Sequence, residues 1–193
     1  MLSFYNKNKL VAGTDEAGRG SLCGPVTAAA VILPNSFKHP LLNDSKKLSE
    51  KQRAILAPII KQKALAYAIC HVGAGKIDQI NILNASIQAM HDCLKKLALK
   101  PELIIVDGNR FKVFQDIPHE TIIKGDGKYM SIAAASILAK TERDSYMEKL
   151  HKEYPVYGWD KNKGYPTKAH RAAIALHGPN ACHRKSFRLL SSQ

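Results

Sequence analysis

The chain has 193 residues, of which 45% are hydrophobic and 7% aromatic, a composition typical of a globular protein. The longest apolar run near its start, Val26–Leu33, is too short to span a bilayer, and the first residues lack a signal-peptide pattern. We therefore exclude a membrane protein and expect a cytoplasmic one. The net charge of +13 indicates a polyanionic partner such as nucleic acid, with general solubility as the alternative.

The elements predicted in the first half of the chain alternate between strands and helices. A strand at about 9–15 leads into a glycine turn, and a second strand at 26–33 pairs with it. Ser49 is the predicted N-cap of a helix that runs to about residue 62. A third strand at 64–72 and a helix at 77–97 follow, the helix being indicated by its apolar spacing.

The second half continues this alternation. Short apolar strands at 103–106 and 121–123 are followed by an alanine-rich helix at 130–150. The order predicts an α/β fold: a mixed central sheet with helices on both faces. We expect one domain over residues 1–193, in which about 151–193 form a small helical extension. This extension has eight Lys or Arg residues against two acids, so we expect it to bind substrate.

The cysteines do not form a metal or disulfide pattern. Four are scattered through the chain without a C-x-x-C pair: Cys23, Cys70, Cys93 and Cys182. We interpret them as free thiols. His177, Cys182 and His183 are close enough in sequence to suggest zinc, but their spacing matches no common zinc pattern. We favour ordinary surface residues there.

Acidic residues follow three of the predicted strands. Asp15, Asp107 and Asp126 stand where these strands end, and ligands of open α/β sheets bind at strand ends. Together with Glu16 they offer oxygen ligands for Mg²⁺ or Mn²⁺. A single such aspartate is more often a turn or cap residue, but three in a chain with few acids favour a metal site.

Asp15 and Glu16 are adjacent, and neighbours on a regular strand point to opposite faces of the sheet. Both can face one cleft only if the strand breaks between them. We therefore assign Asp15 to bridging two ions. Glu16 either binds from the far side or contributes its backbone carbonyl.

Seven blocks, in order along the chain, resemble the bacterial ribonuclease HII family. They are GTDEAGRG at 13–20 with Gly24–Val26, Asp44–Leu48, Val106–Gly108, Lys124–Asp126, SIAAASILAK at 131–140, Gly164–Thr167 and His183–Phe187. The resemblance covers essentially the whole chain and implies a ribonuclease H-like fold. It implies cleavage of the RNA strand of RNA–DNA hybrids and nicking 5′ to ribonucleotides embedded in duplex DNA, during removal of misincorporated ribonucleotides. The expected products are 3′-hydroxyl and 5′-phosphate ends.

The resemblance also implies the site. The family's catalytic, metal-binding acids fall on Asp15, Glu16, Asp107 and Asp126. The implied cofactor is Mn²⁺ or Mg²⁺, with two ions when substrate is bound.

The resemblance further implies which residues contact the substrate. The family's element for reading the ribose 2′-OH falls on Gly18, Arg19 and Gly20, and its substrate-stacking tyrosine falls on Tyr165. A core aromatic is the alternative for Tyr165.

Four further basic or polar residues complete the expected contacts. Lys46 and Lys47 are expected to hold phosphate, with a solvated charge pair as the alternative. Arg184 and Ser186 are expected to contact the DNA strand.

Three other readings are open. Arg143 and Asp144 can form a structural ion pair on the long helix. The chain can also be a non-catalytic hybrid-binding module, or a junction resolvase on the same fold. The absence of a long N-terminal extension disfavours ribonuclease HIII. We expect a monomer.

Overall fold

A mixed sheet forms the middle layer of the computed structural model, which describes residues 2–42 and 48–190. Its strand order is β3-β2-β1-β4-β5. β1 runs antiparallel to β2 and parallel to β4, β3 is antiparallel to β2, and β5 is parallel to β4. The strands are β1 (Val11–Ala17), β2 (Val26–Ile32), β3 (Ala66–Val72), β4 (Leu103–Asp107) and β5 (His119–Ile122).

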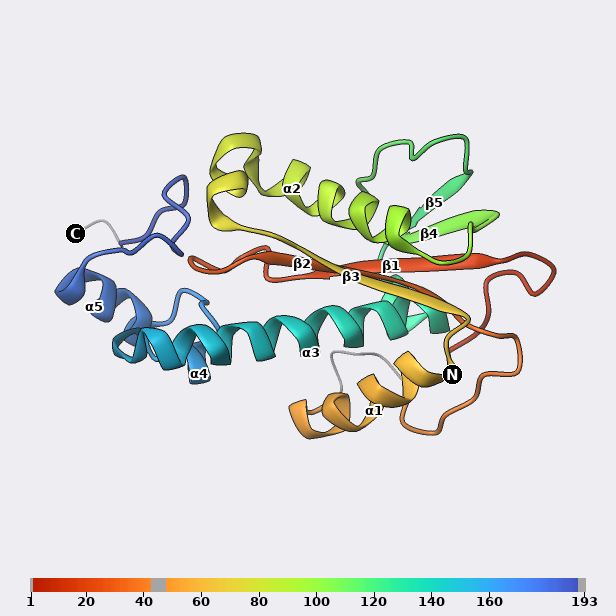
Figure 1. Ribbon diagram of the computed structural model, residues 1–193, viewed down its shortest axis with the longest axis horizontal. Coiled ribbons are helices and arrows are strands. Elements are labelled where there is room, and N and C mark those ends of the chain that lie inside the picture. Colours follow the sequence, from red (N-terminus) through yellow and green to blue (C-terminus); the bar gives the residue numbers. More distant parts are fainter. Residues whose placement is uncertain (1, 43–47, 191–193) are drawn as a thin grey trace.

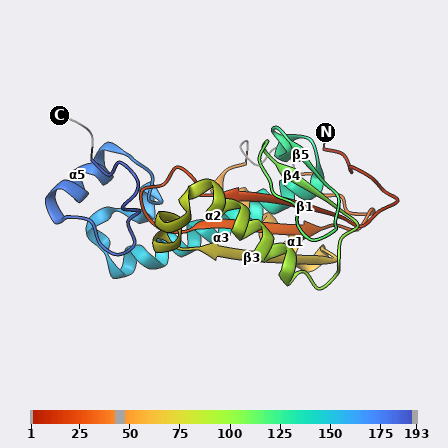
Figure 2. The same cartoon turned by 90° about the horizontal axis from the view of Figure 1, so that it is seen from above.

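Helices cover both faces of the sheet, as the sequence predicts. Helix α2 (Ala74–Lys96) lies on one face, and α1 (Glu50–Lys63) and α3 (Met130–Glu153) lie on the other (Figure 1). Seen from above, α4 (Trp159–Asn162) and α5 (Lys168–His177) lie beyond one end of the sheet (Figure 2). Short 3-10 helices occur at η2 (Gly125–Gly127) and η3 (Pro155–Tyr157). No helix within the described ranges is long and apolar enough to cross a membrane.

Burial along the strands follows their place in the sheet. All seven residues of β2 are buried, because this strand has a neighbour on each side and a helix layer on each face. The edge strand β3 alternates between buried and exposed residues. Helix α1 begins as predicted: Ser49 and Gln52 form a reciprocal capping box, with the Gln52 amide donating to the Ser49 hydroxyl at 3.3 Å.

The largest helix–sheet contact joins α3 to β1. The buried face of α3 is rich in alanine, so the helix approaches the strand closely. A β-carbon added at Gly13 would overlap the backbone of Ser131 and Ile132. The glycine that opens the GTDEAGRG block therefore has a packing function.

Replacing Gly13 with alanine is expected to destabilise the fold. The added methyl group meets backbone atoms that cannot move independently, so we expect a loss of about 2–3 kcal/mol in the free energy of unfolding. Urea denaturation measures it. Gly75 in α2 has open space around its α-carbon, and the matched variant Gly75→Ala should be neutral or slightly stabilising. Equal effects of the two substitutions would contradict this account.

The observed boundaries of several elements differ from those predicted. β1 continues through Glu16 to Ala17 rather than ending at residue 15. Helix α2 begins at Ala74 and breaks at Asn81, whose φ is 65° and whose side chain accepts from the Asn84 amide at 3.0 Å. The last strand ends at Ile122, so Asp126 lies in η2 rather than at the strand end.

Candidate active site

Two of the proposed acids lie side by side where the parallel pairing of β1 and β4 ends. Thr14 of β1 lies opposite Val106 of β4, and the next residue on each strand is Asp15 and Asp107. The Gly125 amide, in the segment that carries Asp126, donates to Asp107 Oδ1 at 2.7 Å. Residues about a hundred positions apart in sequence are thus brought to one end of the sheet.

Asp15 and Glu16 lie on opposite faces of an unbroken strand. Asp15 is 5% exposed and hydrogen bonds with Ser136 of α3. Glu16 lines a small pocket on the α2 face together with Arg19 and Asp107. The strand does not need to break, because Asp107 interacts electrostatically with both neighbours.

The protonation of these acids reflects their crowding. Burial raises the pKa of Asp15 well above its usual range, and the charges of Glu16 and Asp107 raise it further, whereas the Ser136 hydrogen bond lowers it. Burial also raises the pKa of Glu16, and the Arg19 cation opposes this effect. Glu16 Oε1 and Arg19 Nη1 are 3.2 Å apart. A divalent cation near Asp15 and Asp107 would relieve their repulsion, so the donor set suits one.

The acids do not form a closed cage. Within residues 2–42 and 48–190, no group of three or more His, Cys, Asp or Glu side chains is arranged so that it could hold a metal ion. Mg²⁺ usually binds one or two carboxylates and completes its shell with water and substrate phosphate oxygens, so an open set is compatible with it.

In the described part of the chain, His177, Cys182 and His183 do not form a metal site, but the expectation of ordinary surface residues is wrong for His183, which is buried. His183 is 1% exposed, with His170 Nε2 at 3.3 Å from its Nε2 and Asn180 Oδ1 at 2.9 Å from its Nδ1. Burial, followed by the neighbouring His170, lowers the pKa of His183 to about 4. The imidazole is therefore neutral and serves the packing of the C-terminal part.

The loop after β1 is held from inside by Arg184, which is fully buried. Its Nη2, Nη1 and Nε donate to the carbonyls of Gly18, Arg19 and Gly24 at 2.7, 2.9 and 3.1 Å. Burial lowers the pKa of Arg184 to about 10, so the guanidinium stays charged at neutral pH. The expectation that Arg184 contacts DNA is corrected here, because its donors are used within the protein.

The three residues expected to read the ribose face different ways. Gly18 has φ +87°, and a β-carbon there would overlap the Arg143 side chain, so this glycine faces the interior. Arg19 has a half-exposed side chain. Gly20 is exposed and has open space at its α-carbon. The loop is therefore accessible at Gly20 and Arg19, whereas Gly18 shapes it from inside.

Comparisons with known proteins identify the family of the chain. The sequence model of the Ribonuclease HII family matches residues 12–190. The chain belongs to the ribonuclease HII family. The ribonuclease HII of Christiangramia forsetii is 64% identical to it, covering 100% of this chain and 98% of its own. That of Bacteroides thetaiotaomicron is 60% identical, covering 98% and 95%.

Solved structures give the same fold. The ribonuclease H2 of Pyrococcus horikoshii superposes with a TM-score of 0.79 at 26% identity, covering 93% of this chain and 94% of its own. The ribonuclease HII of Archaeoglobus fulgidus, solved in complex with PCNA, gives 0.78 at 27% identity, covering 95% and 98%. The protein is a hydrolase, an endonuclease of the ribonuclease H type.

The other residues that are expected to contact the substrate of this ribonuclease HII family member differ in their exposure and in their partners. Tyr165 is 42% exposed and is not a core aromatic. Ser186 is exposed, and it donates to Asp78 through its amide at 2.9 Å and its hydroxyl at 2.6 Å, so it ties the C-terminal block to α2. Its contact with the DNA strand stays a prediction. Lys46 and Lys47 lie outside the described residues.

The anticipated ion pair within α3 is also corrected. Asp144 Oδ2 lies 3.2 Å from Arg53 Nη2 of α1, whereas Arg143 donates to backbone carbonyls. Sequence reasoning missed Ser136, the partner of Asp15. The sequence signal that could have indicated Ser136 is a hydroxyl residue within the alanine-rich segment of the predicted helix.

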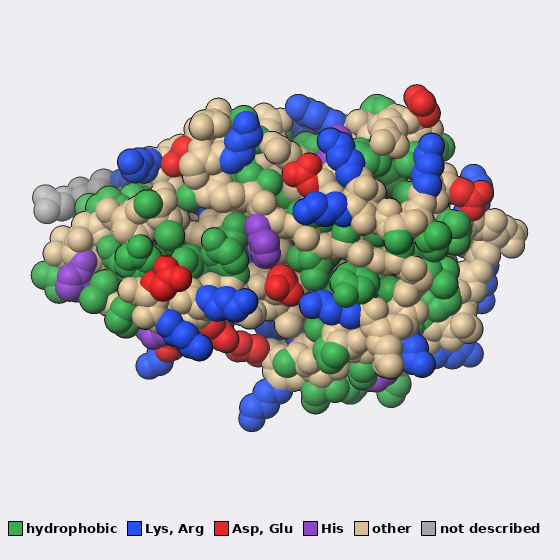
Figure 3. All heavy atoms as spheres, viewed as in Figure 1, with side chains coloured by type: hydrophobic (Ala, Val, Ile, Leu, Met, Phe, Trp, Pro, Cys, Tyr) green, Lys and Arg blue, Asp and Glu red, His purple; other side chains and the backbone are tan. Residues whose placement is uncertain are grey.

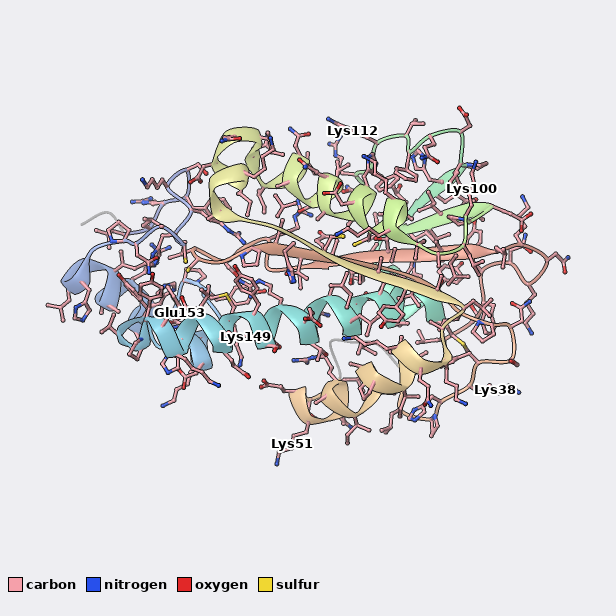
Figure 4. All side chains as sticks on the ribbon, viewed as in Figure 1. Lys38, Lys51, Lys100, Lys112, Lys149 and Glu153 are labelled. Atoms are coloured by element: carbon pink, nitrogen blue, oxygen red, sulfur yellow. The ribbon has the colours of Figure 1, made fainter. Side chains whose placement is uncertain are left out.

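Positive charge is less concentrated in the C-terminal extension than its composition suggests. Lys163 Nζ lies 2.6 Å from Glu148 and 3.4 Å from Glu50, and Arg184 is buried. Lys and Arg side chains are spread over the face in Figure 3. Figure 4 shows four lysines that extend outwards from separate parts of the molecule: Lys38, Lys51, Lys100 and Lys112.

Proposed function

We propose that the protein cleaves the RNA strand of RNA–DNA hybrids and nicks 5′ to ribonucleotides embedded in duplex DNA, with Mg²⁺ or Mn²⁺ as cofactor. One observation carries the proposal: the carboxyl groups of Asp15 and Glu16, whose pKa values are raised by burial and by the charge of Asp107, lie at the base of a loop that presents an open glycine. Such carboxylates destabilise a purely structural site and suit one that accepts cations.

The acids have distinct tasks in this proposal. Asp15 and Asp107 would hold the ions from the point where the pairing of β1 and β4 ends, Glu16 would contribute from the α2 face, and Asp126 would contribute from η2. Bound divalent ions would activate a water molecule and stabilise the leaving 3′-oxygen, giving a 3′-hydroxyl and a 5′-phosphate. Ser136 orients the Asp15 carboxylate, and the Arg19 cation lowers the pKa of Glu16 against the effect of burial.

The loop after β1 supplies the selection for RNA. Gly20 offers an exposed backbone without a side chain, and Arg19 adds a half-exposed guanidinium beside Glu16. Backbone groups at this position can recognise a 2′-OH, which distinguishes RNA from DNA. The exposed ring of Tyr165 provides a flat surface for the sugar on the 3′ side of the ribonucleotide.

Two alternatives make different predictions. A non-catalytic binding module gives no reason for Asp15 to remain buried beside two other acids. A junction resolvase would cut all-DNA four-way junctions, whereas the proposed enzyme leaves them intact and cuts a duplex only beside a ribonucleotide.

Replacing Asp126 with asparagine tests the acid site. Asp126 is 1% exposed, and the amide has nearly the same shape, so the fold and duplex affinity should be retained while a charged metal ligand is lost. We expect cleavage to fall by roughly 100-fold or more. Gel-shift titration and cleavage of one labelled duplex measure both properties. Exposed Asp116 provides the matched control Asp116→Asn, and full activity of Asp126→Asn in Mg²⁺ would remove Asp126 from the site.

A further inference from the structure

A second buried arginine joins the loop after β1 to the segment that precedes Tyr165. Arg143 lies on α3 and is 1% exposed. Its Nε donates to the Pro25 carbonyl at 3.1 Å and its Nη2 to the Cys23 carbonyl at 3.2 Å. Its Nη1 donates to the Lys163 carbonyl at 2.9 Å. One guanidinium therefore spans two segments that are far apart in the sequence.

The two segments also touch each other around this guanidinium. The Leu22 amide donates to the Gly164 carbonyl at 2.8 Å. The Tyr165 ring packs over the guanidinium, with 5.4 Å from Arg143 Cζ to the ring centroid. The loop also passes close to Arg143 at Gly18, where an added β-carbon would overlap the Arg143 side chain. The loop after β1 and Tyr165 therefore both pack against the Arg143 side chain.

Helix α3 connects this support to the acids. Ser136, the partner of Asp15, lies seven residues before Arg143 on the same helix. In Figure 1, α3 runs beneath the sheet and reaches the C-terminal helices. Because seven residues make about two turns, both side chains lie on the same side of α3, which places them along one rigid element.

Arg143 and Arg184 differ in what they hold. The three bonds of Arg184 end on residues 18–24, so it shapes the loop alone. Arg143 reaches both the loop and residue 163. Both are buried cations beside one loop, and the positive charge of Arg143 contributes to lowering the pKa of Arg184. Such an arrangement costs stability unless the carbonyl dipoles offset it.

We propose that Arg143 is a positioning residue that fixes the spacing between the ribose-reading loop and Tyr165. The inference rests on the proposed function, because both segments are taken to contact the ribonucleotide and its neighbour. Arg143 does not touch the substrate; it acts through Tyr165 and the loop. Its fork of donors is required, since the single ammonium group of a lysine cannot span three carbonyls in this way.

A double-mutant cycle on a duplex with one ribonucleotide tests the proposal. We expect Arg143→Lys and Tyr165→Ala each to lower kcat by roughly 10- to 100-fold, with KM changed by less than about threefold. The double variant should lie within about threefold of the more damaged single variant, because coupled residues give non-additive effects. Effects on kcat that multiply fully would overturn the proposal.

The matched control is Arg171→Lys in α5. Arg171 also donates to backbone carbonyls, those of Arg188 and Leu189 at 2.9 and 2.6 Å, but it does not hold the loop or Tyr165 through these bonds. In the wild-type background, Arg171→Lys should leave kcat unchanged. Added to Tyr165→Ala, it should leave the kcat of that variant unchanged. If Arg171→Lys lowered kcat as much as Arg143→Lys, the loss of any arginine that donates to backbone carbonyls would have this effect. That result would overturn the proposal.

Folding and basal function are checked separately. Circular dichroism and thermal unfolding confirm that each variant is folded at the assay temperature. Arg143→Gln replaces Arg143→Lys if the latter is unfolded, and failure of both to fold would show a purely structural residue, contrary to the proposal. If the wild-type protein does not cut the duplex, the proposed function itself is wrong; if it does and the cycle is additive, the positioning role alone is wrong.

Discussion

Asp15→Asn is expected to abolish cleavage and, at the same time, to stabilise the metal-free protein. The amide removes a metal ligand, for which we expect a loss of about a thousandfold in kcat. It also removes a buried negative charge that Glu16 and Asp107 repel. The thermal unfolding midpoint in EDTA should therefore rise by about 2–4 °C for each kcal/mol recovered.

The stabilisation should depend on pH. The folded pKa of Asp15 is raised, so the stability contributed by its proton is fully present below the unfolded pKa and is lost as pH rises through the folded pKa. The advantage of Asp15→Asn should be larger at about pH 8 than at about pH 5. Thermal scans at both pH values, with exposed Asp116→Asn as control, measure it. A variant less stable than the wild type in EDTA would contradict the account.

Arg184→Met is expected to have the largest effect on stability. It leaves the carbonyls of Gly18, Arg19 and Gly24 without these donors in a buried site. Each buried unsatisfied group costs about 1–3 kcal/mol, so we expect a loss of several kcal/mol and a disordered loop. Urea denaturation and cleavage of a ribonucleotide-containing duplex report the two effects.

The neighbouring residue provides the control for this substitution. Lys185 is exposed, and Lys185→Met removes the same positive charge from the same block without removing side-chain bonds to the loop. It should leave the urea midpoint within about 0.5 kcal/mol of the wild type. If Lys185→Met weakened substrate cleavage more than Arg184→Met, direct contact by the C-terminal charges would be the better explanation.

The sequence was sufficient to predict the sheet and the acids that meet at its end. The apolar runs before Asp15 and Asp107 predict two strands, and their parallel pairing, which ends at Thr14 and Val106, brings the two acids together even though β1 continues to Ala17. The α/β fold with helices on both faces is confirmed. The exact position of Asp126 was not predictable, because Lys124 adopts a left-handed conformation (φ 56°) that turns the chain into η2.

The roles of the buried arginines were beyond the reach of sequence patterns. Arg143 stands beside Asp144, and Arg184 lies in a basic tail, so local reasoning favours an ion pair and a DNA contact. Their partners are instead carbonyls up to 166 residues away. Any residue type supplies a backbone carbonyl, so no side-chain pattern marks such a partner.

Cleavage of a labelled DNA duplex that contains one ribonucleotide tests the central claim most directly. The protein is incubated with this duplex in Mg²⁺, Mn²⁺ or EDTA, with an all-DNA duplex of the same sequence as control. We predict one cut, 5′ to the ribonucleotide, in either metal, with a 3′-hydroxyl end and no cut in EDTA or in the all-DNA duplex. Cleavage that is independent of metal or of the ribonucleotide, or no cleavage in either metal, would contradict it.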